Sequence, residues 1–93
     1  MLSKFYVVDE PASLRYIGDE SEVQMDIDIR ARSDALELLG VSQFDFDAAL
    51  EDALERLAQT PPGQLPAPRN IPIWLQGKPH QLGDVARIEV RLS

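Results

Sequence analysis

Five carboxylates between residues 45 and 55 are the side chains whose types and spacing most clearly suit recognition. They are Asp45, Asp47, Glu51, Asp52 and Glu55. Carboxylates that repeat along a helix can imitate the charge pattern of a nucleic acid and occupy a basic site on another protein. The same acids can instead form a solvated helix face that needs no partner, with the first two close to the positive end of the helix dipole. The sequence leaves both interpretations open.

The segment that carries these acids has the layout of a helix-turn-helix, with a short helix, Gly40 and then a longer helix. A DNA-reading helix approaches phosphates and contacts them with lysine and arginine side chains. No lysine or arginine occurs between Asp45 and Glu55. We therefore expect this helix not to bind nucleic acid directly.

Trp74 is the only tryptophan and is a second candidate for contact with another protein. It lies in an apolar segment, residues 71–76, that reads as a strand. Pro72 cannot donate a ladder hydrogen bond, so this strand is expected at a sheet edge, where pairing with another chain is easiest. If Ile71 and Ile73 face the core, alternation turns Trp74 outward as an interface anchor. Alternatively, Trp74 completes the core beneath the proline-rich segment.

Residues suited to catalysis or metal binding are not arranged in a pattern that we recognise. His80 is the only histidine, it is expected in a loop, and the chain contains no cysteine, so no zinc-ligand spacing exists. No serine lies in a nucleophile-elbow sequence, and the five glycines are too far apart for a phosphate-binding loop. We expect a protein that is not an enzyme, with no catalytic residue, cofactor or metal.

Length and composition predict one small domain, residues 1–93, in which 44% of the residues are hydrophobic. The absence of cysteine favours a reducing compartment. We find neither a signal peptide nor an apolar run of membrane-spanning length, so we expect a soluble, cytoplasmic protein with no membrane contact. The excess of arginine over lysine, with abundant alanine and leucine, suggests a bacterial or phage source.

The charge of the chain is strongly acidic and unevenly distributed. The net charge is −7, and fourteen of the sixteen acidic residues come before residue 56. Such a field repels nucleic acid and speeds encounter with basic proteins. A net charge of this size is also common in proteins that acidity merely keeps in solution.

Two segments, Glu22–Arg30 and Asp84–Leu92, alternate between apolar and polar residues as half-buried strands do. The side chains expected to face the core are Val23, Met25, Ile27, Ile29, Ala86, Ile88, Val90 and Leu92. The outward side chains are acidic in the first segment, at Asp26 and Asp28, and basic in the second, at Arg87 and Arg91. If the two strands are neighbours, these opposite charges help to set their register.

Two further strands are expected near the N-terminus. Lys4–Val8 is more apolar, which favours a central position in the sheet. Leu14–Ile17 would be a short partner strand before a turn at Gly18 and Asp19.

Two helices follow the alternating segment that ends at Arg30. The short helix is opened by Ser33 and Asp34 and ended by Gly40. Ser42, with Asp45 three residues later, is typical of a capping box and predicts the start of a long helix. This helix carries an apolar stripe made of Phe46, Leu50, Ala53, Leu54 and Leu57. It is expected to end at Thr60 and Pro61, because the residue before a proline avoids helical geometry.

These elements predict an α+β fold with a small, mostly antiparallel sheet of three to five strands. The long helix packs on one face of the sheet, and the short helix precedes it. A proline-rich segment, residues 61–79, crosses the surface in extended conformation and ends in the strand that contains Trp74.

The run Ala49–Arg69, ALEDALERLAQTPPGQLPAPR, resembles the helix and proline-rich tail of HicB-type antitoxins, with Gly63, Pro66 and Pro68 at similar spacing. Those proteins are small α+β domains that cover the active site of a basic ribonuclease, so the resemblance implies an inhibitory role. The turn rich in proline and glycine that the family places after its first strands is absent here. The resemblance assigns no binding or catalytic residue.

The sequence thus predicts a non-catalytic protein-binding module of the inhibitor, antitoxin or immunity type. Its acidic helix face would block a basic, nucleic-acid-handling protein, with Trp74 as a separate anchor. The alternative is a structural or assembly subunit that forms a homo-oligomer or joins a larger complex through the Trp74 edge strand.

Overall fold

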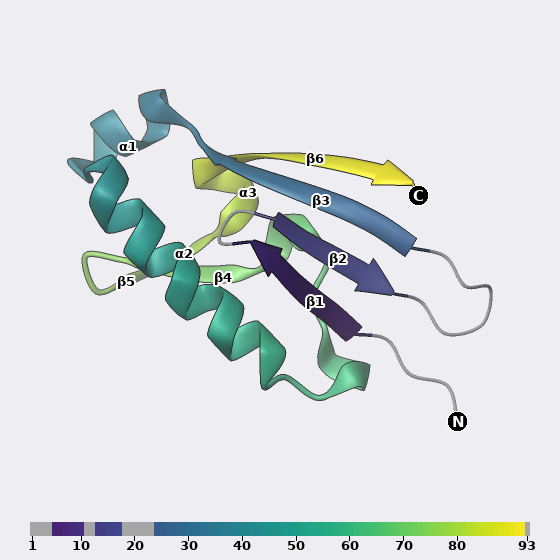
Figure 1. Cartoon of the computed structure of the whole chain (residues 1–93). Coiled ribbons are helices and arrows are strands. Elements are labelled where there is room, and N and C mark those ends of the chain that lie inside the picture. Colours follow the sequence, from purple (N-terminus) through teal and green to yellow (C-terminus); the bar gives the residue numbers. More distant parts are fainter. Residues whose placement is uncertain (1–4, 11–12, 18–23, 93) are drawn as a thin grey trace.

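Six strands and three helices make up the part of the chain that the computed structural model describes, residues 5–10, 13–17 and 24–92 (Figure 1). The strands are β1 (Phe5–Glu10), β2 (Ser13–Ile17), β3 (Gln24–Ala31), β4 (Pro72–Leu75), β5 (Lys78–Gln81) and β6 (Ala86–Leu92). The helices are α1 (Ser33–Leu39), α2 (Gln43–Ala58) and α3 (Leu82–Val85), with two short 3-10 turns, η1 (Pro62–Gln64) and η2 (Pro68–Asn70). A four-stranded antiparallel sheet has the order β1-β2-β3-β6, and β4 and β5 form a separate hairpin. The predicted α+β fold is confirmed, including the long helix and the short helix before it.

The hydrophobic core lies between α2, the larger sheet and the β4–β5 hairpin, which Figure 1 shows around the same interior. All five residues of the predicted apolar stripe of α2 are buried, as are Ile27 and Ile29 of β3. The stripe is buried because α2 contacts both β1 of the larger sheet and β4 of the hairpin. The helix therefore joins the two sheets into one core.

The pairing of β3 with β6 confirms that the two alternating segments are neighbours. Ile27 lies opposite Val90, and Asp26 lies opposite Arg91. The charge-assisted hydrogen bond between the two strands runs diagonally, since Arg91 Nη2 donates to Asp28 Oδ2 at 2.7 Å and not to Asp26 directly opposite. Arg91 thus connects the two strands as predicted, whereas Asp26 pairs with Arg15 of β2 and Arg87 lies opposite Arg30.

Val90 and Leu92 were expected to face the core, but they are 48% and 78% exposed, so this prediction is wrong. They alternate with Glu89 and Arg91 as expected. However, α2 packs against β1, at the opposite side of the sheet from β6. Ala86 and Ile88, earlier on the same face, are buried and half-buried, so the part of β6 that is left uncovered is its second half.

The prediction that the first strand is central is also wrong, because β1 lies at an edge and pairs only with β2 among the described strands. Consecutive strands β1, β2 and β3 pair in order along the chain. A strand that starts such a series has one strand neighbour, and its cover here comes from α2. The predicted turn at Gly18 and Asp19 and the expected core residue Val23 lie outside the described residues.

The ends of the short elements also differ from the predictions. Arg32 rather than Ser33 is the N-cap of α1, and no side-chain cap hydrogen bond is formed there. Gly40 does end α1 in the left-handed conformation, with a φ of 68°. The last strand starts at Ala86 instead of Asp84, because the preceding four residues form α3.

The proline-rich segment is not one extended crossing, because it folds into η1 and η2 before it enters β4. The strand that contains Trp74 pairs with β5 through a two-residue turn, in which Gln76 and Gly77 have φ values of 53° and 76°. Positive φ at both turn residues matches the twist of a tight hairpin. His80, expected in a loop, lies in β5.

The predicted start of α2 at Ser42 is confirmed, since the Asp45 N–H donates to Ser42 Oγ at 3.1 Å. Ser42→Ala removes the acceptor for this N–H group. We expect the free energy of unfolding to fall by about 1 kcal/mol, measured by urea denaturation. Ser33→Ala is the matched control, because Ser33 lies inside α1 and does not cap it. Equal losses for the two variants would contradict the capping role of Ser42.

Candidate functional site

The exposed side of α2 carries the five predicted carboxylates, which we call the acidic face: Asp45, Asp47, Glu51, Asp52 and Glu55. All five are exposed. Asp47, Glu51 and Glu55 follow one another at four-residue spacing, which places neighbouring Cβ atoms about 5–6 Å apart on one side of the helix. The other two lie farther round the same exposed side, at a spacing of seven residues. The helix thus brings the predicted acids together opposite its buried stripe.

The acidic face is not neutralised by any cation of the described residues. The ion pairs found there are Arg15–Asp26, Arg32–Asp34 and Arg91–Asp28, and none involves the acidic face. Asp47 Oδ1 accepts a hydrogen bond from Gln43 Nε2 at 2.9 Å, which leaves its charge in place. Neighbouring like charges at four-residue spacing destabilise a helix. Asp47, Glu51 and Glu55 therefore repel one another along the helix, whereas Asp52 has Arg56 four residues later on its own side.

The start of α1 shows the contrasting arrangement, in which a carboxylate is paired. Arg32 Nη2 donates to Asp34 Oδ2 at 2.8 Å. This hydrogen bond lowers the pKa of Asp34 below its ordinary value and raises the pKa of Arg32. Arg32 is thus already engaged at the start of α1.

Phe44 is an exposed aromatic side chain within the acidic face that the sequence analysis missed. It is 81% exposed and lies on the first turn of α2. Asp47 and Glu51 are three and seven residues later, so they share its side of the helix. The sequence signal for its exposure was its position on the helix, which lies outside the predicted apolar stripe. Phe44 provides apolar contact area surrounded by negative charge.

Trp74 faces outward, as predicted for a strand in which Ile71 and Ile73 are buried, and Leu75 on its other side is buried as well. It remains 43% exposed, and the Arg56 guanidinium lies 4.9 Å from the centre of its ring. Arg56 is nine residues after Asp47, which places these two side chains on opposite sides of α2. Asp52, however, is four residues before Arg56 and shares its side of the helix, so Trp74 lies at the border of the acidic face, away from Asp47. Its predicted role in self-association stays a prediction.

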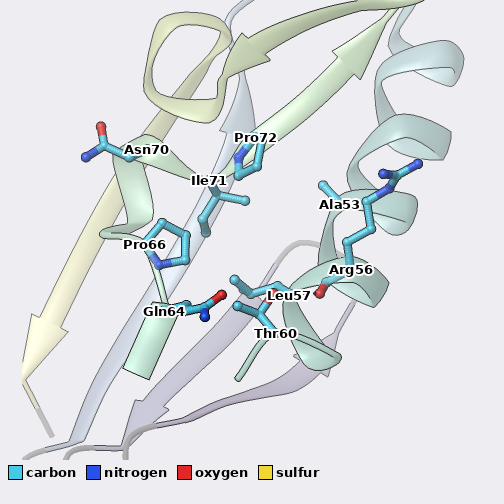
Figure 2. Close-up of a pocket in the computed structure, with 9 residues that line it drawn as sticks. All are labelled: Ala53, Arg56, Leu57, Thr60, Gln64, Pro66, Asn70, Ile71 and Pro72. Carbon is cyan, nitrogen blue, oxygen red and sulfur yellow. Dashed lines mark hydrogen bonds between the residues drawn. The ribbon is translucent and has the colours of Figure 1, made fainter. Parts of the chain in front are cut away.

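A groove of about 310 Å³ lies beside Arg56, between the last turns of α2 and the proline-rich segment (Figure 2). Its lining residues are Ala53, Arg56, Leu57, Thr60, Gln64, Pro66, Asn70, Ile71 and Pro72. The lining is mostly apolar, and Arg56 is its one titratable side chain. Such a surface suits a small apolar group, but it offers no acid–base pair.

His80, the single histidine, lies half-buried at a second depression that Asn70 and Asp84 also line. No serine, threonine or cysteine is part of that lining. Within the described part of the chain, no three His, Asp or Glu side chains come together as metal ligands. None of its helices is both long and apolar enough to cross a bilayer.

Comparison of the chain with known protein families, with curated proteins and with solved structures found no match in any of the three. The resemblance to HicB-type antitoxins therefore stays a likeness of residues 49–69. Arguments about function rest on the geometry of the acidic face and its surroundings.

Proposed function

We propose that this protein binds a basic protein through the acidic face of α2 and acts without catalysis. One observation carries the proposal: five exposed carboxylates on one helix face have no ion-pair partner among the described residues. A partner that supplies lysine or arginine would replace the repulsion between these acids by attraction. The long-range field of the chain, with its net charge of −7, would speed that encounter.

Phe44 adds the contact area that charge alone lacks. Charge complementarity mainly sets encounter rate and selectivity, whereas affinity depends on a few desolvated anchors, commonly aromatic. Phe44 stands next to Asp47 and Glu51 on the helix and is almost fully exposed. In a complex, its ring would enter an apolar pocket while the surrounding acids meet cations.

The partner class follows from the sign and spacing of the charges. Proteins that bind nucleic acid present lysine and arginine in rows that follow phosphates. A rigid helix with repeated carboxylates can occupy such a row, which would block access of the nucleic acid. The likeness of residues 49–69 to antitoxins that cover a ribonuclease supports this class. The role proposed is thus that of an inhibitor of a nucleic-acid-handling protein.

Glu51→Lys tests the proposal because it should separate binding from stability. Glu51 stands four residues from both Asp47 and Glu55, so the lysine converts two repulsive pairs into two attractive pairs. We expect the free energy of unfolding to rise by about 1 kcal/mol. We expect binding of the basic partner to weaken by about 10-fold or more. A variant that is more stable yet fails to bind excludes unfolding as the cause.

The measurement compares three immobilised baits in lysate of the source cells: the unaltered chain, Glu51→Lys and Glu37→Lys. Glu37 is an exposed acid of α1, so its variant makes the same charge change outside the acidic face. A basic protein should bind to the unaltered chain and to Glu37→Lys at 0.15 M salt. It should be lost with Glu51→Lys, and also at 0.5 M salt, where exposed charges are screened. The acidic-face proposal would be overturned if Glu51→Lys captured the basic protein as well as the unaltered chain does, or if Glu37→Lys reduced the capture as much as Glu51→Lys.

A further inference from the structure

We propose that the outer edge of β6 is a homodimer interface, at which β6 of a second copy pairs antiparallel about Val90. β6 lies at the end of the larger sheet, and β3 is its only strand neighbour among the described residues. It pairs with β3 over its whole length without a bulge and contains no proline. A regular edge strand of this kind is a ready template for another strand.

The two edges of the larger sheet differ in a way that points to β6. β1, at the other edge, has a register irregularity between Val8 and Glu10, and α2 lies against it. Bulges and covering helices are the means by which edge strands are protected from pairing. β6 has neither of these along the stretch from Ile88 to Leu92.

Two apolar side chains of β6 are exposed although they lie on the face of the larger sheet that is turned to the core. Val90 is about half exposed and Leu92 is largely exposed, although their neighbours on the same face, Ala86 and Ile88, are buried and half-buried. Both exposed residues lie in the second half of the strand. A second β6 strand beside them would cover this apolar surface.

The charges of β6 select one register for that pairing. With Val90 opposite Val90 on the two-fold axis, Ile88 lies opposite Leu92 on the apolar face. On the other face, Glu89 of each copy lies opposite Arg91 of the other copy. A register centred on Glu89 would place Glu89 against Glu89 and Arg87 against Arg91. A register centred on Ile88 would place Leu92 opposite Asp84, where α3 replaces the strand.

Glu89 provides an independent reason for a partner at this edge. Asp28 lies directly opposite Glu89 on β3, and Arg91 donates its hydrogen bond to Asp28. No cation of the described residues forms an ion pair with Glu89. In the proposed register, Arg91 of the second copy stands next to Glu89 and supplies the missing charge. The edge is thus self-complementary both in charge and in apolar surface.

The homodimer is independent of the proposed function. The acidic face belongs to α2, which packs at the β1 side of the sheet, so β6 can pair while the acidic face stays exposed. Loss of one interaction therefore leaves the other measurable.

Sedimentation equilibrium over a concentration series, up to about 1 mM chain, tests the proposal. The unaltered chain should show a reversible monomer–dimer equilibrium. Val90→Lys places two lysines on the two-fold axis, and we expect the dissociation constant to rise at least tenfold while the circular dichroism spectrum is unchanged. Trp74→Ala, at the competing edge strand β4, should leave the dimer intact. A monomeric unaltered chain, a dimer that survives Val90→Lys, or a dimer lost with Trp74→Ala would each overturn the β6 interface.

A charge-exchange pair tests the register itself. Glu89→Arg and Arg91→Glu chains each place like charges opposite one another in their own homodimers, so each should be monomeric at concentrations where the unaltered chain dimerises. An equimolar mixture places arginines of one chain opposite glutamates of the other at both positions. We therefore expect a heterodimer to form in the mixture. Failure of the mixture to dimerise, with both chains folded, would contradict pairing about Val90.

Discussion

Phe46→Ala is expected to lower the free energy of unfolding by about 3–5 kcal/mol. Phe46 is 1% exposed and lies on the buried stripe of α2, among the largest fully buried side chains of the described residues. Its removal costs the transfer free energy of the ring and also leaves a cavity that the neighbours fill only in part. Domains of this size are stable by about 5–15 kcal/mol in total. The variant should therefore be close to the limit of folding.

The control for this prediction lies two residues away on the same helix. Phe44→Ala makes the identical substitution at a side chain that is almost fully exposed. We expect a change within about 0.5 kcal/mol, typical of surface positions. Urea denaturation followed by circular dichroism compares the two. Similar losses for both variants would show that the ring at position 44 is packed in solution, which would also remove it as a contact residue of the acidic face.

Gly83→Ala is expected to destabilise the protein by about 1–3 kcal/mol, because a methyl group at this buried site would be crowded against Arg69. A Cβ atom at position 83 would lie 3.0 Å from the Cβ of Arg69 and 3.1 Å from its backbone oxygen. The backbone cannot yield as a flexible side chain can, so η2 and α3 must move apart. These two segments flank the β4–β5 hairpin, and their separation would also stretch the contact from Arg69 Nη2 to the Gly83 oxygen, now 3.5 Å. Thermal denaturation should show the loss as a melting temperature lower by several degrees.

Gly63→Ala is the matched control for the close approach at Gly83. No heavy atom lies within 4 Å of the position that a Cβ atom would take at residue 63. Position 63 has space for a methyl group and a negative φ, which alanine adopts without strain. Gly63→Ala should therefore leave the free energy of unfolding unchanged or raise it by about 0.4–1 kcal/mol, because alanine lowers the conformational entropy of the unfolded chain. If Gly83→Ala behaves like Gly63→Ala, the packing of η2 against α3 is looser than the structure indicates.

The sequence by itself determined the elements whose signals are local. The apolar stripe of α2 repeats with the helical period, Ser42 marks its first turn, and Gly40 ends α1, because these patterns depend on atoms within four residues of one another. The same holds for which side chains of β3 and β6 share a face, although their opposite charges could set a register only if the two strands were neighbours. The acidic face follows directly from the position of the stripe.

Only the tertiary structure decided what covers each face. Val90 and Leu92 alternate like core residues, yet they are exposed, whereas Ala86 and Ile88 on the same face of the same strand are buried and half-buried. The edge position of β1 and the separation of β4 and β5 into their own hairpin likewise depend on which segments meet across the chain. A local pattern specifies which side chains share a face, but burial depends on contacts between residues distant in sequence. That is why the exposed edge of β6 could be recognised only once the chain was folded.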